Sequence, residues 1–171
     1  MLNIINNVKL FQPFIEDCYI ELGVREYSKL VHLSPPTASK ILKGFEKQNL
    51  LKMGQDRKYL LFRANRESNL LKDLSVIYWK HKLSEVINYL DSELFASSII
   101  LFGSLSKLES KKDSDIDLAV ISKSKKKLNI ERFNKKYKRE IQLFVFSSLN
   151  KINEELRKNI LNGVFLTGEI E

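Results

Sequence analysis

The sequence predicts an α+β protein in which two domains are joined by a helical segment. Residues 1–66 contain amphipathic helical segments followed by two short strand-like runs. Residues 67–92 have helical periodicity and contain no proline. Residues 93–171 alternate apolar strand-like runs with helical segments, which predicts a mixed β-sheet with flanking helices.

The composition limits the class of protein. The chain has 171 residues, 43% of them hydrophobic and 29% charged, which is an ordinary globular balance. Its single cysteine, Cys18, excludes an internal disulfide framework, and we expect a buried structural thiol in a cytoplasmic protein. No run is long and apolar enough for a membrane span, and the N-terminus lacks signal-peptide features. The net charge of +8 favours polyanionic partners such as nucleic acid or nucleotides.

The N-terminal domain begins with helices. We expect a helix over Asn3–Phe11, interrupted near Pro13, and a second over Val24–Val31. After a turn at His32-Leu33, Ser34 is a good N-cap with Pro35 in the first helical position, and this helix runs to about Gln48.

A β-hairpin is expected after these helices. The strands are predicted at Leu50–Met53 and Lys58–Arg63, joined by a turn at Gly54–Arg57. The tip of the hairpin is basic.

This order of helix, turn, helix and basic hairpin resembles a winged helix-turn-helix of the kind found in archaeal and bacterial regulators. The resemblance implies that the second helix enters the DNA major groove and that the hairpin contacts phosphates. The residues concerned are Thr37, Ser39, Lys40 and Lys43 for the groove, and Arg57 and Lys58 for the hairpin. An excess of 11 Lys and Arg over 6 Asp and Glu in residues 1–66 supports DNA binding. Winged helices also serve as protein-docking or dimerisation modules, and that alternative stays open.

The connecting segment, Glu67–Phe95, is predicted to be helical. Two apolar stripes follow helical spacing, Leu70, Leu71, Leu74, Ile77 and Tyr78 in the first and Leu83, Val86, Ile87 and Leu90 in the second. Trp79 is expected in the core or at a domain interface. The apolar stripe could instead form the seam of a homodimer.

The C-terminal domain is predicted to alternate strands and helices. Strands are expected at Ser98–Phe102, Ile116–Ser122, Glu140–Phe146 and Val164–Thr167, and helices at Ser104–Glu109, Asn129–Tyr137 and Leu149–Leu161. This pattern predicts a small mixed sheet with helices packed against it.

A motif in this domain has the residues of a phosphate and metal site. Gly103-Ser104 follows the first apolar strand, and Asp115 and Asp117 come ten residues later at the start of the next. Residues at i and i+2 of a strand lie on one face, so the two carboxylates form a like-charge pair that a divalent cation would relieve. Gly103 permits a close backbone approach to a phosphate, and a helix opening at Ser104 would offer free N–H groups.

The motif resembles that of the minimal nucleotidyltransferases of the polymerase-beta-like superfamily, in which Gly-Ser precedes Asp-x-Asp by about ten residues. The resemblance covers about residues 90–171 and implies that Asp115 and Asp117 are catalytic residues that hold Mg²⁺. It also implies that Gly103 and Ser104 bind the phosphates of an NTP, ATP above all. The chemistry would be attack of an acceptor hydroxyl on the α-phosphorus.

The superfamily usually has a third carboxylate on a later strand. Glu140 and Gln142 alternate onto the same face of the predicted strand. The apolar run that follows favours Gln142 in the usual carboxylate position, and Glu140 could substitute from one step earlier. Glutamine cannot act as a base, so Glu140 is the catalytic candidate. Asp113, in the loop before the pair, is expected to be solvated.

Three functions fit these observations. The first is Mg²⁺-dependent nucleotidyl transfer to a protein or RNA acceptor, such as a partner protein of the HEPN toxin class, because minimal nucleotidyltransferases of this size resemble the antitoxins of such toxins. The second is a DNA-binding transcriptional regulator in which a catalytically degenerate domain senses nucleotide. The third, a purely structural adaptor, leaves Asp115 and Asp117 without a role.

Overall fold

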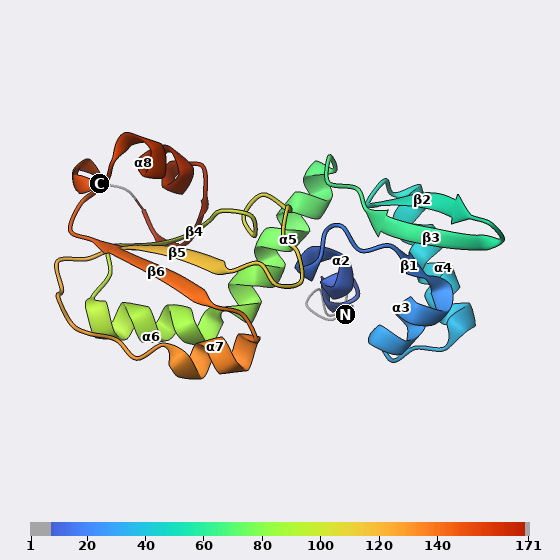
Figure 1. The fold of residues 1–171 in the computed structure, drawn as a ribbon, viewed down its shortest axis with the longest axis horizontal. Coiled ribbons are helices and arrows are strands. Elements are labelled where there is room, and N and C mark those ends of the chain that lie inside the picture. The colour runs from blue at the N-terminus through green and yellow to red at the C-terminus, as the bar shows by residue number, and fades with distance from the viewer. Residues whose placement is uncertain (1–7, 170–171) are drawn as a thin grey trace. The chain divides into compact units, whose positions relative to one another are not determined.

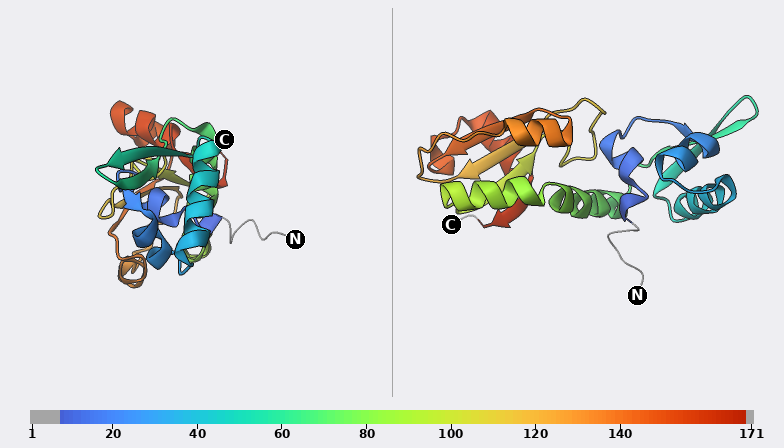
Figure 2. Two further views of the ribbon diagram at one scale, coloured as in Figure 1. Left: turned by 90° about the vertical axis from the view of Figure 1, so that its right-hand side faces the viewer. Right: turned by 90° about the horizontal axis from the view of Figure 1, so that it is seen from below.

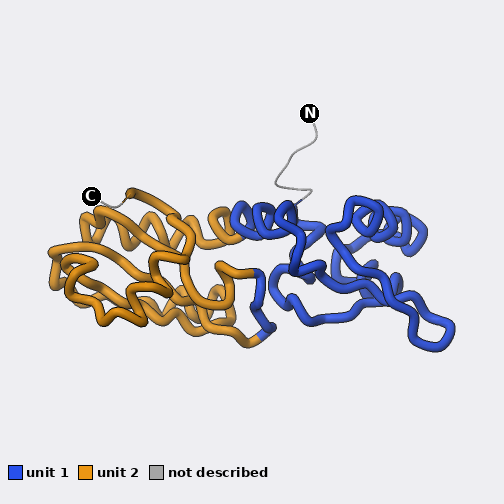
Figure 3. Tube along the Cα trace, turned by 90° about the horizontal axis from the view of Figure 1, so that it is seen from above, with its two compact units in different colours: residues 1–78, 108–112 blue, residues 79–107, 113–171 orange. Residues whose placement is uncertain are grey.

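The computed structural model describes residues 8–169, which form two compact units. The first comprises the chain up to Tyr78 with Leu108–Lys112, and the second comprises Trp79–Lys107 and the chain from Asp113 onward (Figure 3). Most of the helix predicted at Asn3–Phe11 lies outside the described residues. Between residues 8 and 169, no helix has the length and apolar character required to cross a membrane.

The first unit contains helices followed by a hairpin (Figure 1). Its elements are α2 (Gln12–Glu16), β1 (Leu22–Gly23), α3 (Val24–Leu30), α4 (Pro35–Lys47), β2 (Leu51–Asp56) and β3 (Tyr59–Ala64). The strands form an antiparallel sheet in the order β1-β3-β2. The predicted cap of α4 is confirmed, because the Ser34 hydroxyl accepts the Thr37 N–H at 3.4 Å.

The hairpin turn differs from the prediction. Strand β2 continues through Gly54 to Asp56, which pairs with Tyr59, so Arg57 and Lys58 alone form the turn. Arg57 has a φ of 53°, as a tight two-residue hairpin turn requires. The predicted turn at Gly54–Arg57 is therefore wrong, because pairing across the hairpin extends both strands. The two-residue strand β1 was not predicted.

The first unit has a core of aromatic and aliphatic side chains. Tyr27, Leu42 and Phe62 are fully buried, and the Tyr27 hydroxyl donates to the carbonyl of Leu10 at 2.9 Å. Cys18 is buried as predicted, with its Sγ 3.3 Å from the Ser110 hydroxyl oxygen. Burial raises the pKa of the Cys18 thiol.

Two helices occupy the segment that was predicted to be helical, α5 (Asn69–Lys82) and α6 (Ser84–Leu94). The second predicted stripe is buried throughout. The first is wrong in part, because Leu70 and Ile77 are 52% and 43% exposed. Ser75 and Trp79 are buried on α5 instead, and Trp79 is in the core as predicted.

The second unit is built on a four-stranded sheet in the order β6-β5-β4-β7. The strands are β4 (Ser98–Phe102), β5 (Ile116–Ile121), β6 (Ile141–Phe146) and β7 (Val164–Gly168). Strand β4 is antiparallel to both of its neighbours, whereas β5 and β6 are parallel and are connected through α7 (Glu131–Tyr137). The mixed sheet agrees with the prediction.

Helices cover both faces of this sheet (Figures 1 and 2). Helices α6 and α7 lie on one face, where the rings of Tyr89 and Phe133 are 5.3 Å apart. Helix α8 (Glu154–Leu161) lies on the other, and Ile160 packs there with Ile100 and Ala119. The predicted helix over Leu149–Leu161 is split into a 3-10 turn at Leu149–Lys151 and α8, because the Asn153 side chain caps α8 by accepting the Leu156 N–H.

Candidate active site

The candidate site forms where β4 ends beside the start of β5. Phe102, the last residue of β4, pairs with Asp117. Gly103 then turns the chain with a φ of +72°. A Cβ atom at Gly103 would lie 2.2 Å from Asp117 Oδ2, so the backbone passes directly against this carboxylate. Both the backbone conformation and the lack of space require glycine at this position.

Asp115 and Asp117 share one face at the start of β5. Ala119, two residues further along, packs into the cluster on the α8 side of the sheet, so the pleat directs Asp117 to that side as well. Both aspartates are half-buried. Partial burial raises the pKa of Asp117, and the negative charge of Asp115 adds to the effect. The pair is therefore electrostatically unfavourable by itself and would be stabilised by a cation.

Strand β6 brings a third side chain to the pair. In the parallel register Gln142 lies opposite Asp117, and its Nε2 donates to Asp115 Oδ2 at 2.7 Å. Glu140 precedes β6 and is exposed, and its backbone carbonyl accepts the Ile116 N–H at 2.8 Å. Of the two candidates for the third position, the glutamine is thus the one whose side chain contacts Asp115.

The chain before Asp115 is held by a buried arginine. Arg139 is 7% exposed, and its guanidinium donates to the backbone carbonyl of Ser114. This hydrogen bond connects the residues just before β5 with those just before β6. Asp113 is exposed, as predicted.

The two aspartates suit a hard divalent cation. Magnesium often takes one or two carboxylates from the protein and completes its coordination with water and substrate phosphates. Across residues 8–169, no group of three or more His, Cys, Asp or Glu side chains forms a metal site. The two carboxylates of Asp115 and Asp117 could hold Mg²⁺ together with phosphate oxygens.

The predicted helix at Ser104–Glu109 is wrong. Residues 104–108 form consecutive turns, in which the Lys107 N–H donates to the Ser104 carbonyl at 3.3 Å. Leu105 and Leu108 are both buried, and Leu108 has a φ of 58°, which interrupts a helical path. No helix therefore begins at Ser104, and the predicted helix N-terminus is not available to bind a phosphate. Gly103 and the half-buried Ser104 remain beside the aspartates.

The residues predicted to bind DNA all lie in the first unit. Lys40 and Lys43 are exposed on α4, Ser39 is half-buried there, and Arg57 and Lys58 form the exposed hairpin turn. The exposed Thr37 has its hydroxyl oxygen 2.8 Å from that of Ser34, so it takes part in capping α4. Tyr59, beside this turn, is 72% exposed, and no motif in the sequence pointed to it.

Comparison with known proteins identifies the second half of the chain. Residues 84–169, half of the chain, match the family described as Polymerase beta, Nucleotidyltransferase. The matched segment begins at the first residue of α6 and contains Gly103, both aspartates and Gln142. Comparison with the curated proteins and with the solved structures gave no match. The chain therefore belongs to the polymerase beta nucleotidyltransferase family.

Proposed function

We propose that the second unit transfers a nucleoside monophosphate, AMP from ATP, to a hydroxyl group of a protein or RNA acceptor. The observation that carries this proposal is the pair of half-buried carboxylates of Asp115 and Asp117, with Gly103 packed against the second. Membership of the nucleotidyltransferase family supports the reaction class. A partner protein, such as a toxin of the HEPN class, is the proposed acceptor.

The reaction exchanges one bond at phosphorus for another. The acceptor oxygen bonds to the α-phosphorus, the bond from that phosphorus to the bridging oxygen breaks, and pyrophosphate leaves with the electron pair. Mg²⁺ held by Asp115 and Asp117 would neutralise phosphate charge when bound. The Gly103 backbone and the Ser104 hydroxyl would bind phosphate oxygens, and the fixed position of these groups would orient the nucleotide.

The proton of the acceptor hydroxyl needs a base or water. Gln142 cannot accept it, because an amide has no basic site at neutral pH. Its contact with Asp115 instead makes it a positioning residue. We propose Glu140 as the base, and a Glu140→Gln variant should then bind nucleotide normally and transfer AMP slowly. Equal rates in the variant and the unmodified protein would exclude this role.

Titration calorimetry of ATP into the full chain with Mg²⁺ tests the site. The Asp115→Asn/Asp117→Asn variant should lose binding, whereas Asp113→Asn, which removes an exposed carboxylate from the preceding loop, should retain it. Incubation with α-labelled ATP and extract of the host cell should then label a protein or RNA. Nucleotide binding that survives in the double variant would contradict the proposal.

For the first unit, we propose a winged helix-turn-helix that binds DNA. The supporting observation is that α4 carries the exposed Lys40 and Lys43 and that the hairpin of the same unit ends in Arg57 and Lys58. Lysine and arginine side chains in these positions would contact phosphates. An α4 inserted in the major groove would place its N-terminal residues near the base edges.

Fluorescence anisotropy with labelled DNA from upstream of the gene tests this proposal. A Lys40→Gln/Lys43→Gln variant should bind more weakly and show a smaller dependence on salt, because fewer counterions are released. Lys72→Gln, which removes an exposed charge from α5, serves as the matched control. If random DNA binds as tightly as upstream DNA, the first unit does not act as a sequence-specific regulator.

An alternative proposal joins the two units in one function. The Gln142 amide in contact with Asp115 favours a regulator that binds nucleotide without turnover and whose DNA affinity responds to it. DNA titrations with and without MgATP would then differ, and no labelled acceptor would appear. Transfer of label to an acceptor would exclude this alternative.

A further inference from the structure

Strand β6 forms one edge of the sheet in the second unit. Among the residues that the structure describes, β5 is the only strand that pairs with it. Along a strand, backbone groups that face the neighbouring strand alternate with groups that face away. The Phe146 carbonyl accepts the Ser122 N–H at 2.9 Å, so the even-numbered residues of β6 face β5. Leu143 and Val145 therefore direct their backbone N–H and C=O groups away from the sheet.

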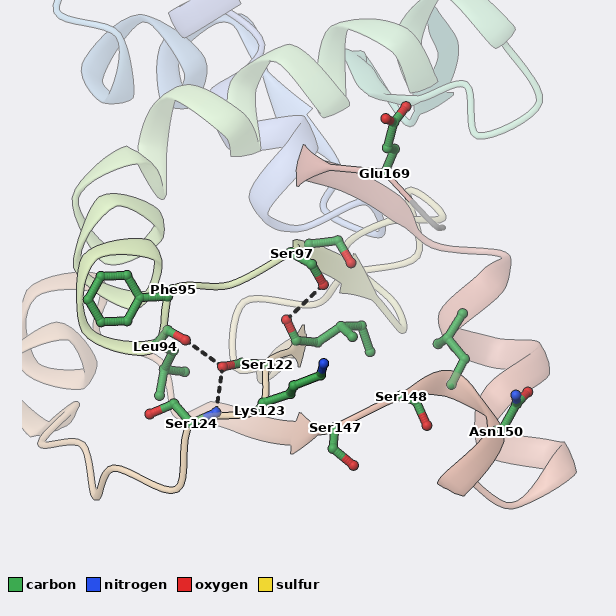
Figure 4. Close-up of a pocket in the computed structure, with 13 residues that line it drawn as sticks. Leu94, Phe95, Ser97, Ser122, Lys123, Ser124, Ser147, Ser148, Asn150 and Glu169 are labelled. Carbon is green, nitrogen blue, oxygen red and sulfur yellow. Dashed lines mark hydrogen bonds between the residues drawn. The ribbon is translucent and has the colours of Figure 1, made fainter.

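The open part of this edge lies between two boundaries. At the start of β6, the outward N–H of Ile141 donates to the side-chain oxygen of Asn134 at 3.1 Å. At the other end the chain leaves β6 at Ser147 (Figure 4). Between these boundaries, the outward N–H and C=O groups of Leu143 and Val145 have no hydrogen-bond partner within residues 8–169.

Strand β6 lacks the features that usually protect an edge from pairing with another chain. Such features are charged side chains, proline, bulges and very short strands. The six residues Ile141–Phe146 include no charged residue, no proline and no glycine. They pair with β5 in one continuous register, and Val145 is 40% exposed. The edge is therefore suited to accept a further extended strand.

One face of this edge is the face that carries the aspartates. Gln142 lies opposite Asp117, and Phe144 packs against the cluster on the α8 side of the sheet. Residues that lie opposite each other on adjacent strands point to the same face, and adjacent strands are about 4.8 Å apart. A side chain opposite Gln142 on an added strand would therefore lie next to the Gln142 amide, which contacts Asp115.

We propose that the acceptor is an extended protein segment that adds to β6 as a further strand and presents a hydroxyl-bearing side chain opposite Gln142. The inference rests on the nucleotidyl transfer proposed at Asp115 and Asp117, and it selects protein over RNA as the acceptor. Outward N–H and C=O groups repeated every second residue match the backbone of an extended polypeptide, whereas RNA has no such backbone. The residues that flank the hydroxyl would be apolar, because they lie beside Leu143 on the other face of the sheet.

This docking would bring the hydroxyl to the nucleotide. The added strand would lie two strand spacings, about 10 Å, from β5, with its hydroxyl side chain directed to the face of the aspartates. The hydroxyl oxygen bonds to the α-phosphorus of ATP, and pyrophosphate leaves with the electron pair of the broken P–O bond. The hydroxyl proton passes to Glu140, the proposed base.

Nuclear magnetic resonance of the ¹⁵N-labelled full chain tests the docking without any reaction. The probe is a synthetic peptide in which valine alternates with threonine between glutamate ends. It should shift the amide signals of Leu143 and Val145. Methylation of the peptide nitrogens at either the valines or the threonines should abolish binding in one case and spare it in the other, because only alternate N–H groups face β6. No shift at β6, or equal effects of the two methylated peptides, would overturn the proposal.

Two variants at one position separate the backbone from the side chain. Proline is tolerated at an edge where the N–H faces solvent, so Val145→Pro should keep the pairing with β5 and weaken peptide binding by about tenfold. Val145→Thr retains the N–H and should bind the peptide normally. Both variants should bind MgATP like the unmodified protein in calorimetry. A dimeric unmodified protein that Val145→Pro makes monomeric in sedimentation would assign the edge to a second copy and overturn the proposal.

Transfer of label from α-labelled ATP to the peptide separates the docking from the chemistry. The unmodified protein should label threonine, and Val145→Pro should label it more slowly by the factor that it loses in binding. The Asp115→Asn/Asp117→Asn variant should bind the peptide and transfer nothing. A peptide that binds β6 and receives no AMP would contradict the proposed reaction and leave the docking site in place. Labelling at the full rate in Val145→Pro would overturn the docking site and leave the reaction in place.

Discussion

The side-chain amide of Gln142 donates a hydrogen bond from Nε2 to Asp115 Oδ2 at 2.7 Å. The same residue lies opposite Asp117 in the parallel pairing of β5 with β6. A neutral amide holds the Asp115 carboxylate in place without adding a third negative charge to the pair. Gln142 thus fixes the position of the Asp115 carboxylate, and it is neither a base nor a strong metal ligand.

Replacing Gln142 with glutamate should make the site more dependent on metal. A third carboxylate beside Asp115 repels the other two. We therefore expect the free energy of unfolding of the metal-free variant to fall by about 1 kcal/mol, or its Tm to fall by about 2–4 °C. Mg²⁺ should restore the loss. Thermal unfolding in EDTA and in Mg²⁺ measures both effects. Gln142→Met, which removes the hydrogen bond without adding charge, should show no such response, and a Gln142→Glu variant unaffected by Mg²⁺ would contradict the prediction.

Replacing Gly103 with alanine should damage both stability and binding. The new Cβ would meet Asp117 Oδ2 at 2.2 Å, and the φ of +72° is unfavourable for alanine. We expect the free energy of unfolding, measured in urea, to fall by about 2 kcal/mol. We also expect MgATP binding, measured by calorimetry, to be lost. Gly54→Ala is the control, since nothing lies within 4 Å of its Cβ position. Equal stability of the two variants would show that the close approach is unimportant.

The raised pKa of Asp117 makes its contribution to stability dependent on pH. Because burial and Asp115 favour its protonated form in the folded state, the folded protein keeps this proton at pH values where the unfolded chain has lost it. Ionisation of Asp117 therefore costs stability as pH rises through the ordinary aspartate range of about 4 and up to the raised pKa.

An Asp117→Asn variant should remove this penalty. In metal-free buffer it should be more stable than the unmodified protein at neutral pH, and the difference should disappear below pH of about 4. Unfolding by denaturant at a series of pH values measures the difference. Asp113→Asn, which changes an exposed carboxylate, should show a smaller effect. A difference that grows toward low pH would have the wrong sign.

Replacing Lys58 with glutamine should weaken DNA binding uniformly across sequences. Lys58 is exposed in the two-residue turn of the hairpin, where a phosphate contact would be independent of base sequence. The slope of log affinity against log salt should fall by about one. Anisotropy titrations at several salt concentrations measure the slope. An unchanged slope would place the hairpin turn outside the DNA contact.

Local patterns in the sequence were enough to predict much of the second unit. The apolar run Ser98–Phe102 forms β4 with the predicted bounds. Asp117 lies in β5 and Asp115 directly precedes that strand, at the i and i+2 spacing that predicted one shared face. In the first unit, Ser34 and Pro35 mark the start of α4 correctly. Each of these features depends on neighbours within a few residues.

Tertiary structure decided the features that depend on distant residues. The choice between Glu140 and Gln142 required the register of β6 against β5, and the need for glycine at position 103 required the carboxylate of Asp117 to approach it. Residues 104–108 form turns, and not the predicted helix, and both Leu105 and Leu108 are buried there. Strand register and side-chain burial are set by contacts between residues far apart in the chain, and no local pattern contains them.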